Sequence, residues 1–145
     1  MTQHREVCHV AHPDLDLART LADVARGLLR DFPGQQDDRQ LQTRYHRLAI
    51  ALELTLKSYL IVRGHTDEAN RRIGHDLRRV AQVATAEGLT VPSALYDLIE
   101  DTHPFFMRGG FHREYRTDWQ RHRADRAATE LDALLTGIAA PIGAR

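Results

Sequence analysis

The chain has 145 residues, enough for one domain with its own apolar core; 42% of them are hydrophobic and 28% are charged. This composition excludes a disordered tail, and the longest apolar run, residues 48–52, is far shorter than the ~18 residues of a membrane-spanning helix. Twenty basic residues balance twenty acidic ones, which argues against a general nucleic-acid coat protein but leaves room for a local basic patch.

The cysteine content and the N-terminal residues suggest where the protein works. Cys8 is the single cysteine, so no disulfide can form within the chain, and a reducing compartment is favoured. The first 14 residues lack the apolar stretch of a signal peptide. We therefore expect a cytoplasmic protein without a membrane segment, with a flexible N-terminal segment over residues 1–13 and a single domain over residues 14–145.

Apolar residues that recur every three or four positions predict helices, since no period-two run or hairpin signal is present. A first helix is expected from Asp14, its N-terminal cap, to Asp31. A second is expected from residue 37 or 38 to Gly64, and it is apolar on almost every side, which places it at the centre of a bundle. The first helix is expected to bury Leu17, Leu21, Val24 and Leu28.

Three further helices are expected. A third runs from its cap Thr66 to Gly88, a fourth from Pro92 to residues 103–104, and a last from residue 117 or 118 to Pro141. The predicted fold is all-α, a single bundle of about five helices with the long second helix at its centre. Residues 103–116 hold three of the four phenylalanines, so this segment covers the core, which we favour, or meets a partner chain.

Residues 48–89 hold the most distinctive pattern in the sequence. Leu-Glu-Leu-x-Leu-Lys-x-Tyr-Leu occupies residues 52–60 on the second predicted helix, and Gly-His-Asp-Leu occupies residues 74–77 on the next. Together these motifs resemble the HEPN domains (higher eukaryotes and prokaryotes nucleotide-binding). The resemblance implies an all-helical, usually dimeric protein. Many members are metal-independent ribonucleases of toxin–antitoxin or phage-defence systems, and others are non-catalytic.

Catalytic members of that family carry an arginine followed, after four to six residues, by a histidine. Arg116 and His122 have this spacing, so the resemblance implies them as the catalytic pair if the chain is an enzyme. A histidine can move a proton at a ribose 2′-hydroxyl, and an arginine can hold the phosphate charge. On one continuous helix their side chains would point about 120° apart, so a second chain would have to complete the site. We favour binding without catalysis.

Basic residues mark two further candidate regions for a phosphate-bearing ligand. The polar face of the third predicted helix is basic, and residues 108–126 hold six arginines against three acidic residues, a local charge of +3 that would attract a phosphate backbone. Of the 20 basic residues of the chain only Lys57 is a lysine, so 19 are arginines, which bind phosphate with two parallel hydrogen bonds. The candidate ligand-binding residues are Arg71, His75, Arg78 and Arg113.

A second polar group is predicted inside the bundle. Glu53 and Lys57 are four residues apart on the apolar second helix, and Asp76 falls on the apolar stripe of the third. A buried carboxylate needs a partner, so these three residues are expected to form a structural ion-pair cluster, with Asp76 near Lys57. A ligand-binding role for the cluster is the alternative. No metal site or other cofactor is expected.

The resemblance implies two possible functions, and the sequence leaves a third open. The first is a HEPN-like, non-catalytic module that binds nucleotide or RNA, within a toxin–antitoxin or defence system. The alternative is a metal-independent endoribonuclease of the same fold that uses Arg116 and His122. The third is a helical adaptor that binds another protein. A homodimer is expected, and the resemblance implies a cognate antitoxin or nucleotidyltransferase as a partner.

Overall fold

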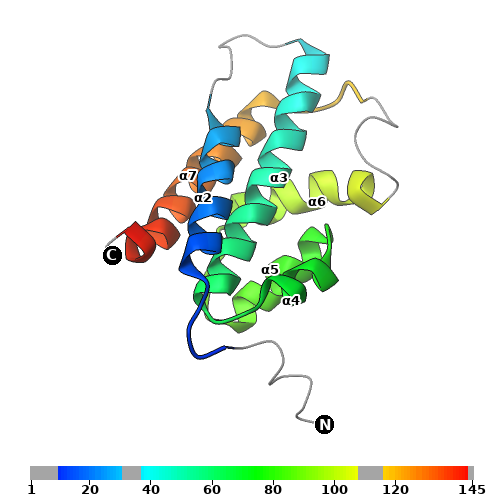
Figure 1. Cartoon of the computed structure of the whole chain (residues 1–145). Coiled ribbons are helices and arrows are strands. Elements are labelled where there is room, and N and C mark those ends of the chain that lie inside the picture. The colour runs from blue at the N-terminus through cyan, green and yellow to red at the C-terminus, as the bar shows by residue number, and fades with distance from the viewer. Residues whose placement is uncertain (1–9, 31–36, 108–115, 144–145) are drawn as a thin grey trace.

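The computed structural model describes residues 10–30, 37–107 and 116–143. These segments form helices and contain no strand, as the sequence predicts. Six helices follow one another along this part of the chain (Figure 1). They are α2 (Leu15–Leu29), α3 (Asp38–Val62), α4 (Asp67–Ile73), α5 (Leu77–Ala86), α6 (Ser93–Met107) and α7 (Arg121–Gly143).

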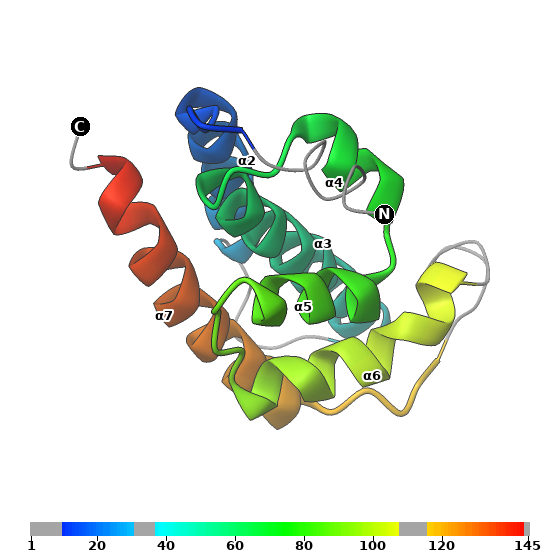
Figure 2. The same cartoon turned by 90° about the horizontal axis from the view of Figure 1, so that it is seen from below.

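Helix α3 is the central element, which confirms the prediction from its all-round apolar sequence. It packs against each of the other five helices (Figures 1 and 2). A capping box closes its start, because the Asp37 carboxylate accepts from the Gln40 backbone N–H and the Gln40 side chain accepts from the Asp37 N–H. Even its polar side chains Glu53, Thr55, Lys57 and Ser58 are buried.

The N-terminal cap of α2 is the predicted one, but its buried face is not. Asp14 accepts a hydrogen bond from the Leu17 N–H at 3.0 Å. The side chains that face the core are the three alanines Ala18, Ala22 and Ala25, whereas Val24 is 49% exposed. The leucines expected on the buried face flank the alanines and are only half-buried. Small alanines allow α2 to lie close to α3. This close packing explains why the alanine face of α2 is buried rather than the predicted leucine-rich face.

The third predicted helix is two helices, α4 and α5. Gly74 ends α4 in a conformation with φ of +67°, which favours glycine, and Asp76 then caps α5 by accepting from the Arg79 N–H at 3.1 Å. The continuous helix from residue 66 to 88 was therefore a wrong prediction. Because Gly74 was placed in the interior of one helix, the sequence prediction missed both the end of α4 and the cap of α5.

Two prolines that were expected to end helices lie inside them. Pro104 is within α6 and Pro141 is within α7. In each case the next residue is an anchored apolar side chain: Phe105 is 1% exposed in the main core, and Ile142 packs with Ala18 and Ile61. This burial holds the chain in a helix through the position where proline lacks an N–H to donate.

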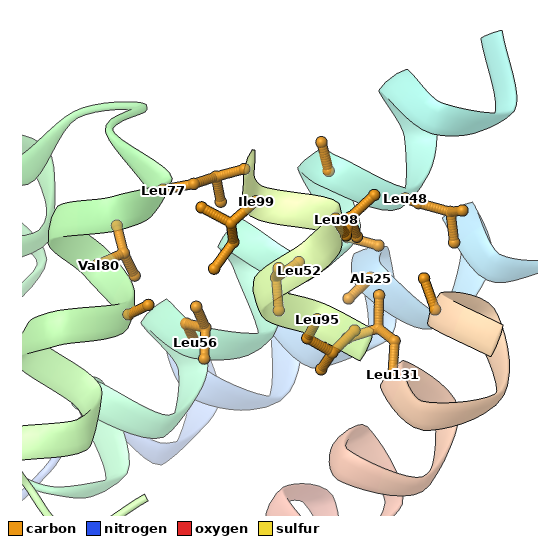
Figure 3. Packing of buried hydrophobic residues seen from close by; sticks show 14 of the residues in the cluster. Ala25, Leu48, Leu52, Leu56, Leu77, Val80, Leu95, Leu98, Ile99 and Leu131 are labelled. Atoms are coloured by element: carbon orange, nitrogen blue, oxygen red, sulfur yellow. The ribbon is translucent and has the colours of Figure 1, made fainter. Parts of the chain in front are cut away.

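The core is formed where α3 meets α5, α6 and α7. Leu48, Leu52 and Leu56 of α3 point toward side chains from all three neighbours and from α2 (Figure 3). Phe105 from the phenylalanine-rich segment belongs to this core, as the favoured interpretation predicts; residues 108–115 lie outside the described residues. The labelled neighbours of α3 in Figure 3 are Ala25, Leu77, Val80, Leu95, Leu98, Ile99 and Leu131.

Among the described helices, none is both long and apolar enough to cross a membrane.

The observed face of α2 predicts effects of different size on stability at two adjacent residues. Ala25 is fully buried, so Ala25→Leu should overpack the contact with α3 and lower the free energy of unfolding by about 1–3 kcal/mol. Val24→Leu adds one methylene at an exposed position and should change it by less than about 0.5 kcal/mol. Urea unfolding of both variants measures the difference. A larger loss of unfolding free energy for Val24→Leu than for Ala25→Leu would show that the predicted leucine-rich face is the buried one.

Candidate functional site

Two adjoining hollows lie where α3, α6 and the start of α7 meet. We name them the small hollow, with a volume of about 70 Å³, and the large hollow, with a volume of about 320 Å³. Tyr45, Asp101 and Arg123 line both, so the two spaces share one wall. The small hollow is further lined by Ala94, Asp97, Leu98, His122 and Arg126, and the large one by Arg116, Asp118, Trp119 and Gln120.

The segment before α7 is held by one side chain of α3. The Gln42 side-chain oxygen accepts from the Arg116 backbone N–H at 2.8 Å and from the Trp119 ring N–H at 3.0 Å. The Trp119 ring is buried against Tyr45, with ring centroids 4.3 Å apart, and against Phe105 at 5.2 Å. These contacts hold Arg116 and Trp119, two residues that line the large hollow, against the central helix α3.

Arg116 is bound on two sides within the large hollow. Its guanidinium donates two hydrogen bonds to the Asp118 carboxylate, at 2.7 and 2.6 Å, and lowers the pKa of that carboxyl. The guanidinium carbon lies 4.5 Å from the centroid of the Trp119 ring, in a cation–π contact. The arginine of the predicted catalytic pair is therefore part of a stacked ion pair.

An ion pair and a tyrosine form the wall between the hollows. Arg123 of α7 donates to both oxygens of Asp101 of α6, at 3.0 and 3.2 Å, and hydrogen bonding to that carboxylate raises the pKa of Arg123. The Tyr45 hydroxyl donates to the Gln120 backbone oxygen at 2.7 Å. Burial, followed by the nearby Asp101 charge, raises the pKa of Tyr45 from 10.0 to about 12. This phenol therefore remains a hydrogen-bond donor at neutral pH.

His122 and Arg126 of α7, together with the Asp97 carboxylate of α6, are the side chains of the small hollow with unused hydrogen-bonding capacity. His122 and Arg126 are four residues apart on α7, and both residues are exposed. Within the described part of the chain, neither makes a hydrogen bond or an ion pair. An imidazole and a guanidinium from one face of α7 therefore line the small hollow.

The structure places the predicted pair in different hollows. Arg116 lines the large one and His122 the small one, with Arg123 and Asp101 in the wall that the hollows share. Helix α7 begins at Arg121, five residues after Arg116, so the expected divergence along one helix does not apply. The relative position of Arg116 and His122 is set instead by residues 116–120, which are not helical.

The other predicted ligand-binding residues do not converge. Arg71 pairs with Asp67 along α4, and Arg78 donates to both oxygens of Glu100 on α6. His75 lies in the connection between α4 and α5, not on the basic face of a helix. The remaining candidate, Arg113, lies outside the described residues.

The internal polar cluster has a different third member from the predicted one. Glu53 is buried, with 4% of the residue exposed, and its carboxylate contacts the Lys57 ammonium at 3.1 Å and the His75 ring nitrogen Nδ1 at 3.0 Å. Lys57 also donates to the Gly74 carbonyl oxygen at 2.6 Å. Asp76, expected beside Lys57, instead caps α5. The turn at Gly74 causes the exchange, because it moves residue 76 off the predicted helical stripe.

None of the three residues that line both hollows, Tyr45, Asp101 and Arg123, was singled out from the sequence. Tyr45 lies on the second predicted helix, and nothing nearby in sequence indicates that its hydroxyl reaches residue 120. Asp101 and Arg123 come from different predicted helices, and the sequence does not indicate their ion pair. The described residues contain no group of three His, Cys, Asp or Glu side chains arranged to hold a metal ion. No protein-family model, curated protein or solved structure matches the chain.

The raised pKa of Tyr45 predicts a stability change at high pH. Above about pH 10 the Tyr45 hydroxyl loses its proton in the unfolded chain but keeps it in the folded protein until about pH 12. Between these values the unfolded chain therefore binds fewer protons than the folded protein. The free energy of unfolding should therefore fall with pH in this window, by up to about 1.4 kcal/mol per pH unit from this group. Urea unfolding across the window should show a shallower decrease for Tyr45→Phe than for the native chain.

Tyr96→Phe is the matched control, because it removes the hydroxyl of a tyrosine that is 43% exposed. Equal slopes for the native chain and Tyr45→Phe would show that Tyr45 ionises alike in the folded and unfolded states.

Proposed function

We propose that the chain is a HEPN-like, non-catalytic module that binds a phosphate group of RNA or of a nucleotide in the small hollow. The observation that carries the proposal is the arrangement of His122 and Arg126 on α7, exposed and without partners in the described residues. Together they offer several N–H donors to one anion. The volume of about 70 Å³ is several times the roughly 10–15 Å³ that a cavity needs to hold one water molecule, which leaves room for a phosphate group.

The formal charges that line the small hollow balance, because Arg123 pairs with Asp101 and Arg126 offsets the remaining carboxylate, Asp97. The attraction for an anion therefore comes from the α7 side, where His122 and Arg126 lie. The small hollow also adjoins the first turn of α7, whose positive end adds attraction for a phosphate. The patch is weaker than the sequence charge of +3 indicates, because carboxylates occupy Arg116 and Arg123. We therefore expect modest, salt-sensitive affinity.

Binding without cleavage is the version that the geometry supports better. In a ribonuclease, Arg116 would have to leave Asp118 and Trp119 and act on the same phosphate as His122, across the Arg123–Asp101 pair. The endoribonuclease remains the alternative proposal, tested by the same variants. Homodimer formation and a toxin–antitoxin or defence context belong to the proposal through the family resemblance.

Fluorescence anisotropy with a labelled, mixed-sequence single-stranded RNA tests the binding. Arg126→Ala should weaken binding at least about fivefold and should reduce the slope of log affinity against log salt by about 0.7, the value for one lost phosphate contact. Arg79→Ala is the matched control: this arginine is exposed, makes no ion pair within the described residues and lines neither hollow. It should leave both quantities close to those of the native chain.

Two results would contradict the proposal. Absence of binding at low salt would remove the nucleic-acid function, and equal effects of the Arg126 and Arg79 variants would remove the small hollow as its site. A metal-free incubation of the same RNA with the native chain, Arg116→Ala and His122→Ala tests catalysis. We expect no cleavage, and cutting that both substitutions abolish would establish the ribonuclease alternative.

A further inference from the structure

We infer that Asp97 makes the small hollow specific for RNA over DNA, because its carboxylate accepts a hydrogen bond from a ribose 2′-hydroxyl while His122 and Arg126 bind the neighbouring phosphate. The inference rests on the proposed function and names the class of nucleic acid that the same site binds. It starts from Asp97, the carboxylate of the small hollow that makes no ion pair within the described part of the chain.

Two helices bring opposite charges to the small hollow. Asp97 and Asp101 are four residues apart on α6, and His122 and Arg126 are four residues apart on α7, with Arg123 between them. Arg123 and Asp101 form an ion pair, at 3.0 and 3.2 Å. Asp97 acts on Arg123 through its charge but makes no hydrogen bond or ion pair with any described residue. The small hollow therefore holds a carboxylate acceptor on α6 and two donor side chains on α7 that do not pair with one another.

A phosphate group alone satisfies only the α7 side of the small hollow. Its oxygens accept from His122 and Arg126, but the Asp97 carboxylate has acceptor atoms only and repels an anion. A ligand that carries an O–H donor beside its phosphate reverses this effect, because the hydroxyl donates to the carboxylate in a charge-assisted hydrogen bond. The lining of the small hollow therefore favours a phosphate with a neighbouring hydroxyl group.

RNA carries this combination at each internal linkage. The ribose 2′-hydroxyl stands on the carbon next to the one that carries the 3′-phosphate, so the donor and the anion are adjacent. DNA lacks the hydroxyl. In a nucleoside 5′-monophosphate, the carbon next to the one that carries the phosphate bears the ring oxygen and no hydroxyl. The 2′-hydroxyl is the group by which a protein site distinguishes RNA from DNA.

The remaining lining of the small hollow suits a sugar within a longer strand. Ala94 and Leu98 lie on the same face of α6 as Asp97 and present carbon atoms, against which the C–H groups of a ribose ring can pack. Asp97, His122 and Arg126 are all exposed, so the strand can continue into solvent on both sides of the bound linkage. The ligand that this lining selects is an internal linkage of single-stranded RNA.

Fluorescence anisotropy with three labelled single strands of one sequence tests the inference. The strands are RNA, DNA with deoxyuridine in place of thymidine, and 2′-O-methyl RNA, which keeps the ribose but lacks the O–H donor. At one salt concentration, the native chain should bind RNA at least about fivefold more tightly than either of the other strands, the effect of one hydrogen bond.

Asp97→Ala removes both the acceptor and the negative charge. It should tighten the binding of DNA, because the repulsion is lost, and it should lower the preference for RNA about fivefold, to near equality. A purely structural role of Asp97 would instead weaken the binding of all three strands together. Asp132→Ala is the matched control, since Asp132 is an exposed carboxylate of α7 that lines neither hollow and makes no ion pair within the described residues. It should keep the preference, and circular dichroism checks that both variants fold.

The outcomes separate this inference from the proposed function. Equal affinity of the native chain for the three strands, with salt-sensitive binding that still depends on Arg126, would overturn the inference and leave phosphate binding standing. A preference for RNA that survives Asp97→Ala, or 2′-O-methyl RNA that binds as tightly as RNA, would also overturn it. Absence of binding by every strand at low salt would overturn the proposed function itself.

Discussion

The burial of the middle of α3, where every residue from 51 to 58 except Leu54 is buried, is the constraint on which the rest of the structure depends. A buried stretch of helix has no water for its polar side chains, so each must find a partner within the helix, as Thr55 does at the Ala51 carbonyl oxygen, or on a neighbouring element. Ser58 donates to the Ala18 carbonyl oxygen of α2, and Lys57 donates to the Gly74 carbonyl oxygen at the end of α4. These bonds join the surrounding helices to the centre at particular residues.

The same constraint creates the hollows. Gln42 and Tyr45, one turn apart on α3, bond to the chain at residues 116, 119 and 120 and thereby fix where α7 begins. The carboxylates of α6 and of the segment before α7 then bind most of the nearby arginines. The arginines that look equivalent in the sequence are therefore not equivalent in the structure, and Arg126 retains its hydrogen-bonding capacity among the described residues because no carboxylate pairs with it.

The sequence predicted what is local and missed what depends on distant partners. The caps at Asp14 and Thr66 and the central place of α3 follow from short-range patterns and are confirmed. The buried face of α2 was wrong by one position, because close packing against α3 favours alanine, a tertiary effect. The bond from Trp119 to Gln42 joins residues 77 positions apart, and no pattern in a single sequence indicates such a pairing.

The central claim is that Gln42 holds Arg116 and Trp119 in place and so preforms the large hollow. Hydrogen exchange by NMR tests it most directly, because the one tryptophan gives a single indole N–H signal. The account predicts that this indole N–H and the Arg116 backbone N–H exchange far more slowly than in the unfolded chain, as hydrogen-bonded groups do. Exchange of both at the unfolded rate, with the α3 amides still protected, would contradict it.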